Sequence, residues 1–297
     1  KAPPPLEPGV HMFEDWDLAD LRACIDWTPF FRAWELAGTY PEILQDEVVG
    51  ESATTLFADA NAMLDQIIAE KWLTPKGVVG LWPCARDGDD VTIHLAEEEQ
   101  NITLSFLRQQ IRKSRDRSNM CLADFIDPDG DWIGGFAVGI HGIDPHIARF
   151  RAGHDDYNDI LLKALADRFA EAFAERLHSH VRTALWGYAP GEQLTNEALI
   201  KEQYRGIRPA PGYPACPDHS LKPILFDLLN ATANTGITLT ESYAMLPTAA
   251  VSGFYFGHQQ AEYFGVARIG RDQLEDYATR RGADIDTATR WVRPNLD

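Results

Sequence analysis

Apolar residues recur at helical spacing in two long segments of the chain. In residues 54–72 the stripe consists of Leu56, Ala60, Met63, Leu64, Ile67 and Ile68. In residues 155–186 it consists of Ile160, Leu161, Leu165, Phe169, Phe173, Leu177 and Val181. Side chains three and four positions apart share one face of an α-helix, so this pattern predicts two long amphipathic helices. Two shorter helices are expected near the C-terminus, at residues 271–282 and 285–291.

Elsewhere the apolar residues form short runs that are typical of strands. Residues 78–82 and 91–95 flank the turn-forming segment 86–90, which predicts a hairpin. Further strand candidates are residues 121–125, 133–139, 250–256 and 263–267. Strands in adjacent pairs and helices in blocks indicate an α+β fold with a largely antiparallel sheet, rather than a βαβ alternation. Because no linker-like break interrupts the pattern, we expect one domain over residues 1–297.

The composition narrows the classes of function. The chain has 27 Lys and Arg against 45 Asp and Glu, a formal net charge of −18. Such an acidic surface repels phosphate backbones, which argues against nucleic-acid binding as the main function. No apolar run approaches the roughly 20 residues that a membrane helix needs. The four cysteines are widely spaced and do not suggest a disulfide framework, so they favour a reducing, cytoplasmic setting.

The first ten residues contain four prolines and lack the apolar core of a signal peptide. Proline-rich segments of this kind act as semi-rigid spacers. We therefore expect residues 1–10 to be the remnant of an interdomain linker in a longer polypeptide. The alternative is a protein that stands alone.

Common catalytic and cofactor motifs are missing. The sequence has no glycine-rich dinucleotide or phosphate loop, no G-x-S-x-G and no H-E-x-x-H. Cys216 and His219 have metal-like spacing, but a closed zinc site needs a second close pair, so we expect a structural loop. On a helix His178 and His180 point about 200° apart, which predicts a solvated face rather than a chelate. Residues 144–149 approach the cobalt-histidine motif of B12 proteins, but an arginine replaces its glycine. We predict no metal site and no catalytic acid or base in this chain.

Residues 205–217 are the most informative segment. They contain four prolines and two glycines, which fix the backbone and leave carbonyl groups free to accept hydrogen bonds. Arg208 is suited to binding a carboxylate through two parallel hydrogen bonds. Free carbonyls suit an ammonium or an adenine amino group. The segment therefore predicts either a site for a small zwitterion or a plain surface turn.

On this loop the chain resembles the activation domain of cobalamin-dependent methionine synthase. Arg208, Gly212 and Tyr213 stand in the places of that family's R-x-x-x-G-Y signature. The resemblance covers almost the whole chain, in order, through residues 25–31, 46–71, 154–158, 186–190, 239–242 and 271–278. It implies a single C-shaped α+β domain in which helices flank a twisted, largely antiparallel β-sheet. It also implies that S-adenosylmethionine binds in a shallow groove on the inner face.

The resemblance assigns roles to individual residues. Asp26 resembles the carboxylate that holds the methionine ammonium, and Arg208 resembles the residue that anchors the loop and its ligand. Ala210 would contribute backbone contacts to the adenine, Gly212 belongs to the signature turn, and Tyr213 would lie near the sulfonium methyl group. The alternative interpretation of the aspartate is a helix N-cap, and that of the tyrosine is a half-buried packing aromatic.

Four further positions follow from the same resemblance. Tyr263 and Phe264 resemble a pair that lines the nucleoside, although the family often has a second tyrosine where Phe264 stands. If the two alternate in a strand, one of them belongs to the core. Glu171 and Glu202 resemble carboxylates that orient the tyrosine or the ammonium. Without the resemblance, both glutamates would be interpreted as solvated charges.

The activity that the resemblance implies is reductive methylation by a methyltransferase domain. In that family a flavodoxin or a flavin reductase supplies one electron to inert cob(II)alamin, and the cob(I)alamin formed takes the methyl group of S-adenosylmethionine. Cobalamin is then held by another domain of the same polypeptide, and this chain alone is not expected to turn over. The acid–base demand is small, so positioning is the main task.

Two questions of partnership stay open at this point. Flavodoxins are acidic, so the basic run Arg108, Arg112, Lys113, Arg115 and Arg117 is a docking hypothesis, with a solvated face as its alternative. The competing function is a module that senses S-adenosylmethionine or docks a reductase without a catalytic role of its own. An independent methyltransferase on another acceptor is disfavoured because the glycine-rich loop is missing.

Overall fold

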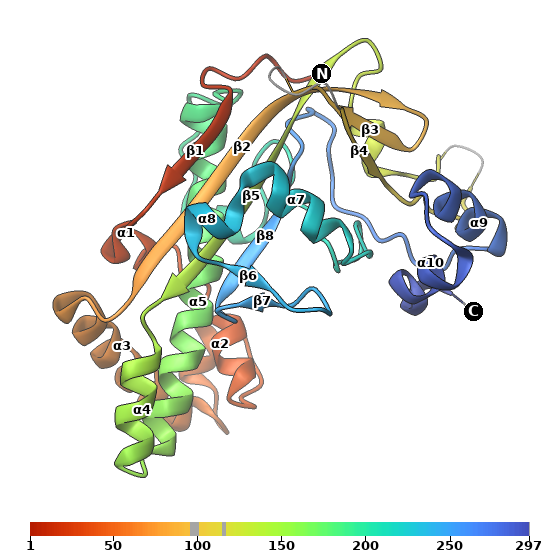
Figure 1. Ribbon diagram of the computed structural model, residues 1–297. Coiled ribbons are helices and arrows are strands. Elements are labelled where there is room, and N and C mark those ends of the chain that lie inside the picture. Colours follow the sequence, from red (N-terminus) through yellow and green to blue (C-terminus); the bar gives the residue numbers. More distant parts are fainter. Residues whose placement is uncertain (96–100, 115–116, 297) are drawn as a thin grey trace.

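The computed structural model describes residues 1–95, 101–114 and 117–296, and its centre is a curled antiparallel sheet (Figure 1). In these residues six strands pair in the order β4-β3-β2-β5-β8, with β1 also beside β2. The strands are β1 (Gly9–Phe13), β2 (Thr74–Asp87), β3 (Asp90–Ile93), β4 (Ile102–Ser105), β5 (Asp131–His141) and β8 (Ala250–Tyr255). A two-stranded ribbon lies apart from this sheet and consists of β6 (Thr238–Leu239) and β7 (Met245–Leu246). The described pairings are antiparallel, which confirms the predicted fold class.

The central strands are buried on both faces. Val78 and Val79 of β2 are both fully buried, yet they belong to different hydrophobic clusters. Phe254 and Tyr255 at the end of β8 likewise belong to different hydrophobic clusters. Successive side chains of a strand point to opposite faces, so both faces of this sheet need a cover. The covering helices are α5 (Asp156–His180) on one face, and α7 (Leu221–Leu229) and α8 (Ala231–Thr235) on the other.

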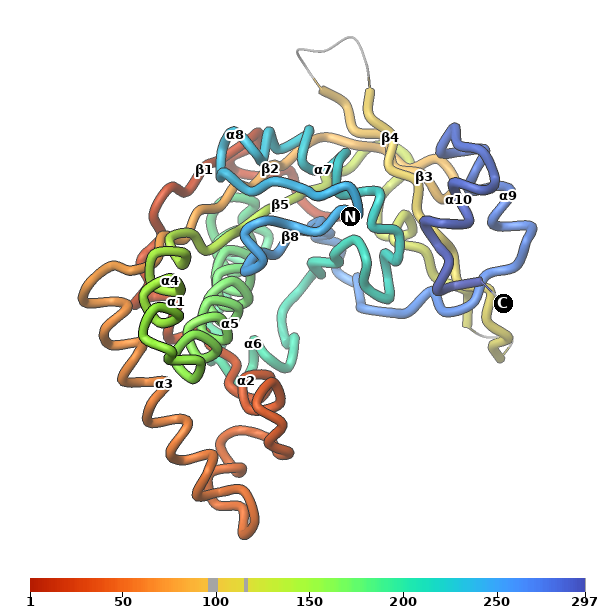
Figure 2. The backbone as a smooth tube through the Cα atoms, turned by 60° about the horizontal axis from the view of Figure 1, so that its bottom comes forward, coloured from red at the N-terminus to blue at the C-terminus, as the bar shows by residue number. Residues whose placement is uncertain are grey.

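The remaining elements form the two arms of a C, as the resemblance implied (Figure 2). The helical arm consists of α2 (Thr28–Ala33), α3 (Gly50–Glu70) and α4 (Asp144–Ala152), which contact α5. The opposite arm carries β3 and β4 together with α9 (Arg271–Arg280) and α10 (Ile285–Trp291). The two remaining α-helices are short: α1 (Leu18–Arg22) and α6 (Asn196–Ile200). Figure 2 shows α6 in the opening between the arms.

The helices predicted from periodicity are present as α3, α5, α9 and α10. The predicted stripe of α5 is buried except at Ile160, which is 53% exposed. After His180 the chain continues as one π-helical turn, Val181–Leu185, so the helical segment ends close to the predicted boundary. Among the described helices, none combines the length and the apolar character that crossing a membrane requires.

Two of the predicted strands are wrong. Residues 121–125 contain the 3-10 helix Leu122–Phe125, because the Asp124 carboxylate accepts a hydrogen bond from Cys121 N at 2.9 Å and closes a turn. Residues 263–267 form no strand, because Val266 N donates to a carbonyl of the preceding loop at 2.8 Å instead of to the sheet. Strand β1 was not predicted, and it begins at Gly9, inside the segment interpreted as a linker.

The proline-rich start of the chain packs against the rest of the structure. Trp186 Nε1 donates to Pro3 O at 2.8 Å, and Glu7 N donates to Leu185 O at 2.9 Å. Ala2 is only 3% exposed. These contacts hold residues 2–7 against the segment that follows α5, directly before β1 enters the sheet.

Candidate functional site

Helix α5 presents a polar stripe toward the loop of residues 205–217. Glu171, Glu175 and His178 lie four and three positions apart, so they share one face of the helix. Glu175 is 7% exposed and His178 is fully buried. The imidazole stacks on Tyr255 of β8 with ring centroids 5.0 Å apart. The prediction of a solvated histidine at 178 is therefore wrong, because β8 covers this part of the helix.

The stripe holds the guanidinium group of Arg208. Its Nη1 and Nη2 donate to the two carboxylate oxygens of Glu175 at 3.1 and 2.7 Å. Nη1 also lies 3.0 Å from Tyr204 Oη and 3.2 Å from His178 Nδ1. Nη1 carries two hydrogens for these three neighbours, so they share its donors. Arginine cannot accept, so an acceptor role for His178 Nδ1 places the imidazole proton on Nε2, which has no partner among the described residues. The carboxylate paired with Arg208 in this structure is thus Glu175, and this pairing anchors the loop.

Burial and charge together set the protonation states around this clamp. Burial lowers the pKa of Arg208, but Glu175 and two neighbouring tyrosines outweigh it, so the pKa is raised overall. Burial, followed by the charges of Arg182 and Arg208, lowers the pKa of His178 well below its usual value. Burial raises the pKa of Glu202 against the opposing charge of Arg208. The clamp therefore combines a permanent cation with a neutral imidazole.

Residues 209–216 form a tight turn that is tied to the sheet. Phe254 N of β8 donates to Pro209 O at 2.9 Å. Gly212 reverses the chain with a φ of +94°, and its N–H donates to Cys216 O at 2.7 Å. A residue with a Cβ adopts this left-handed conformation only with strain. The rigidity expected from the prolines and glycines is thus present in the backbone contacts.

Two adjacent cavities lie beside α5, and the turn lines one of them. The larger, of about 330 Å³, is lined among others by Ala210, Tyr213, Tyr263 and Phe264. The smaller, of about 270 Å³, is lined among others by Asp26, Cys24, Pro29 and Arg168. Glu171, Glu202 and Arg208 line both, so the cavities adjoin, and we call them together the loop groove. Eight of the nine predicted site residues thus line one groove, and Gly212 shapes its turn.

The smaller cavity is acidic. Among the described residues neither Glu171 nor Glu202 has an ion-pair partner. Asp26 Oδ1 accepts from Thr28 N at 3.1 Å, next to the start of α2, so the N-cap interpretation is partly realised. The other oxygen of Asp26 has no partner in the described part of the chain. The carboxylates that line this cavity outnumber its two arginines, Arg168 and Arg208. The cavity therefore favours a cationic group of a ligand.

The larger cavity is mostly apolar and aromatic. Tyr213 is 61% exposed at the tip of the turn, and Tyr263 is 37% exposed. Phe264 is partly buried against two hydrophobic clusters, so this member of the pair contributes to packing. Tyr263 Oη accepts a hydrogen bond from Arg208 N at 3.0 Å. Apolar walls with a few fixed polar groups suit a flat heteroaromatic ligand.

Sequence reasoning missed two residues that hold the groove, Glu175 and Tyr204. Glu175 lies among the buried positions of α5, a helix that the sheet and other helices enclose. A helical-wheel plot of this segment would therefore have indicated a buried charge. Tyr204 carried no comparable signal, because it follows α6 in an irregular segment. Its importance arises only from tertiary contacts, including the Arg182 guanidinium 4.2 Å from its ring centroid.

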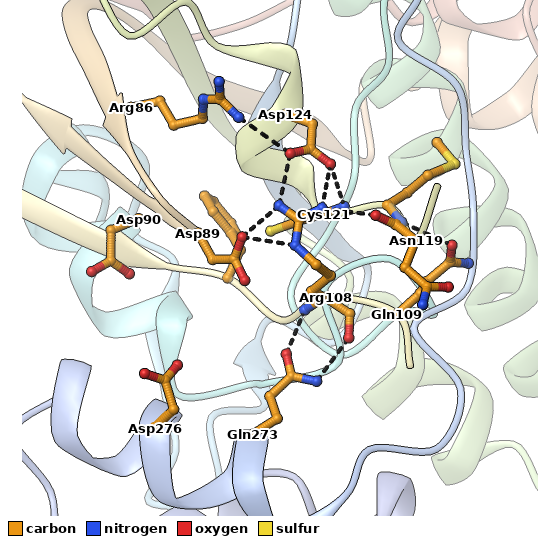
Figure 3. A network of polar contacts seen from close by, with 12 residues as sticks. Arg86, Asp89, Asp90, Arg108, Gln109, Asn119, Cys121, Asp124, Gln273 and Asp276 are labelled. Carbon is orange, nitrogen blue, oxygen red and sulfur yellow. Dashed lines mark hydrogen bonds and ion pairs between the residues drawn. The ribbon is translucent and has the colours of Figure 1, made fainter. Parts of the chain in front are cut away.

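The basic run proposed for docking is divided by the structure. Arg108 points inward, where its Nε and Nη1 donate to Asp89 at 2.9 Å and to Asp124 at 2.7 Å (Figure 3). Its backbone also exchanges hydrogen bonds with the Gln273 side chain of α9 at 2.7 and 2.8 Å. Lys113 donates to the Gln109 side chain. The charge of Arg108 is paired within the fold. Lys113 is partly buried and bonds neutral oxygens, so its charge stays unpaired among the described residues.

Arg112 and Arg117 are exposed, and neither has an ion pair within the described ranges. Arg115 lies outside the described residues. Of the five predicted docking residues, two thus remain as exposed cations in the described structure.

The Cys216–His219 segment is committed to the fold. Cys216 is 2% exposed, and burial raises the pKa of its thiol. Asp218 accepts from Tyr277 Oη at 2.6 Å and from Arg281 Nη1 at 2.7 Å, which ties the loop to α9. In the parts of the chain that the structure describes, no cluster of three or more His, Cys, Asp or Glu is arranged to hold a metal ion.

Comparison with known proteins shows which family this chain resembles. The family model described as "Vitamin B12 dependent methionine synthase, activation domain" matches residues 17–282. One similar solved structure is described as "Crystal Structure of the MetH Reactivation Domain bound to AdoHcy". It is 52% identical in sequence with a TM-score of 0.94, and the match covers 100% of this chain and 93% of that chain.

Proposed function

Because this chain belongs to the activation-domain family of vitamin B12-dependent methionine synthase, we propose that its loop groove binds S-adenosylmethionine. We further propose that the domain presents the methyl group of this ligand to a cobalamin carried by another domain of the same polypeptide. The activity is then that of a methyltransferase domain that restores methylcobalamin. The isolated chain binds the methyl donor but does not turn over.

The residues of the groove fit the chemistry of the ligand. S-adenosylmethionine carries an ammonium, a carboxylate, a sulfonium and an adenosine group. Asp26, Glu171 and Glu202 suit the two cationic groups, and neither glutamate has an ion-pair partner among the residues that the structure describes. Arg208 Nε has no described partner and suits the carboxylate, while the aromatic cavity suits the adenosine. The carboxylates at the junction of the cavities suit a sulfonium between these ends.

The contribution of this chain is binding and orientation. When bound, S-adenosylmethionine supplies a methyl group activated by a positively charged sulfur. Tyr213, at the exposed tip of the turn, is placed to contact this group. No proton has to be moved at the methyl group, so a rigid loop and an oriented ligand are what the chain must provide. The Glu175–Arg208 pair and the Gly212 turn provide that rigidity.

One observation carries the proposal. Arg208 and Tyr213 of the R-x-x-x-G-Y signature meet Glu171 of α5 in one groove, in a chain whose whole length matches a domain solved with AdoHcy. Isothermal titration of the chain with S-adenosylmethionine should give one saturable site. Reconstitution with a cobalamin domain and an electron donor then separates methyl transfer from the alternative of a sensing or docking module. Failure of either step would count against the corresponding part of the proposal.

Asp26→Asn should weaken S-adenosylmethionine binding about tenfold, because the ligand loses a charge-assisted partner. The asparagine keeps an oxygen for Thr28 N, so the start of α2 and the melting temperature should change little. Titration calorimetry measures the affinity. Asp65→Asn is the matched control, since its carboxylate on α3 is 70% exposed and lies outside the groove. Equal affinity of both variants would remove Asp26 from the site.

We propose that a flavodoxin or flavin reductase delivers the electron and docks through Arg112 and Arg117. In the described part of the chain both guanidinium groups are exposed and have no ion pair, which suits the acidic surface of a flavodoxin. The setting we propose is the cytoplasm, because all four cysteines are free thiols and three of them are buried.

The double variant Arg112→Glu/Arg117→Glu should slow donor-dependent reactivation of the full polypeptide several-fold at low salt. The effect should shrink as salt screens the surface charges. S-adenosylmethionine affinity should stay unchanged, because neither arginine lines the groove. Arg32→Glu, on the exposed side of α2 in the opposite arm, is the control. A reactivation rate that does not respond to the double reversal would exclude this docking surface.

A further inference from the structure

The hydroxyl of Tyr204 connects the Arg208 clamp to the wall of the loop groove. Tyr204 Oη lies 3.0 Å from Arg208 Nη1 and 3.2 Å from Tyr263 Oη. Tyr204 itself lies behind Tyr263 and does not line either cavity of the groove. Tyr263 Oη in turn lies 3.0 Å from Arg208 N, so the two tyrosines and the arginine form a closed set of contacts.

The donor chemistry of arginine fixes the direction of these hydrogen bonds. The guanidinium only donates, so Tyr204 Oη accepts from Arg208 Nη1. Either hydroxyl could donate in the contact between Tyr204 Oη and Tyr263 Oη. The donor is assigned to Tyr204, because among the described residues its proton has no other acceptor, whereas Tyr263 lines the groove and its proton can reach water or a ligand there. Tyr263 Oη also accepts from Arg208 N, so both of its lone pairs are used by the protein. Its own proton is left to point into the groove.

We propose that Tyr204 is a positioning residue that directs the Tyr263 hydroxyl proton toward a hydrogen-bond acceptor on the bound nucleoside. This inference rests on the proposed binding of S-adenosylmethionine in the same groove. The relay begins at a cation, and charge-assisted donors make stronger hydrogen bonds than neutral ones. Burial raises the pKa of Tyr204, and Tyr263 adds to this effect against the opposing Arg208, so the phenol keeps the proton that the relay requires.

The ring of Tyr204 is separately held by packing, which allows the hydroxyl to be tested alone. It lies against the Arg182 guanidinium at 4.2 Å and meets the His178 ring edge-on at 4.9 Å. Tyr204→Phe keeps both contacts and removes only Oη. S-adenosylmethionine affinity should then fall about fivefold to tenfold, while the melting temperature changes little. Tyr157→Phe is the matched control, since its hydroxyl bonds Asp59 at 2.6 Å away from the groove.

A double-mutant cycle distinguishes this role from a structural one. If Tyr204 acts through Tyr263, Tyr263→Phe should lower the affinity at least as much, and Tyr204→Phe should add nothing in that background. Independent, additive losses would overturn the inference, as would wild-type affinity in Tyr204→Phe. If the unmodified chain does not bind S-adenosylmethionine, the proposed function falls and this inference falls with it. Titration calorimetry of the four proteins gives all of these results.

Discussion

Arg208→Ala should reduce S-adenosylmethionine affinity roughly 100-fold, the largest effect expected of any single substitution in this chain. The same change should lower the free energy of unfolding by about 3 kcal/mol, because it leaves the carboxylate of Glu175 buried without its partner. The side chains of the pair are 19% and 10% exposed, so water replaces little of the lost interaction. Calorimetric titration and chemical denaturation measure the two effects.

Arg271→Ala is the matched control for this prediction. Arg271 also pairs with a glutamate at 2.7 Å, but the two side chains are 84% and 55% exposed. An exposed pair of this kind contributes less than about 1 kcal/mol. Arg208→Lys keeps the charge but not the planar fork, so its affinity should fall between those of the wild type and the alanine variant. An Arg208→Ala protein that binds like the wild type would show that the clamp does not govern the groove.

Gly212→Ala should destabilise the domain by about 1–2 kcal/mol and lower ligand affinity roughly tenfold or more. The backbone φ of +94° is strained for any residue with a Cβ, and this Cβ would lie 2.0 Å from His219 Cε1. The imidazole would have to move away and lose its contact with Lys222 Nζ at 3.2 Å. Because Tyr213 follows directly, the distortion reaches the groove. Thermal unfolding and calorimetric titration measure the outcome.

Gly191→Ala provides the comparison for the glycine. Gly191 lies in the same loop-rich region, its φ is not left-handed, and nothing lies within 4 Å of an added Cβ. This variant should therefore match the wild type in stability and affinity. If Gly212→Ala matched it as well, the turn would not be the rigid element that holds Tyr213.

Much of the fold could be predicted from the sequence because local pattern and tertiary burial agree there. Of the seven apolar positions that marked residues 155–186 in the sequence, all except Ile160 are buried in the core. Where local pattern and tertiary burial disagree, tertiary contacts determine the secondary structure. Residues 263–267 have an apolar pattern typical of a strand, but no free sheet edge meets them and their backbone bonds the loop instead. Residues 121–125 turn because a side chain, Asp124, competes for the backbone.

The residues of the candidate site could be predicted because their order along the sequence resembles that of the activation-domain family. The signature residues of the loop and the distant Asp26 were all predicted, and the structure brings Asp26 and Arg208 to one cavity. The burial and the contacts of the side chains around the site could not be predicted, because they come from elements far apart in the sequence. His178 is buried by Tyr255, which lies 77 positions later, and no local pattern reports that contact.

A crystal structure of the chain grown with S-adenosylmethionine would show whether the loop groove binds this ligand. We expect the ammonium beside Asp26, the adenosine against Tyr263 and Phe264, and the methyl group near Tyr213. A ligand bound on another surface, or a groove that stays empty at saturating ligand, would contradict this expectation.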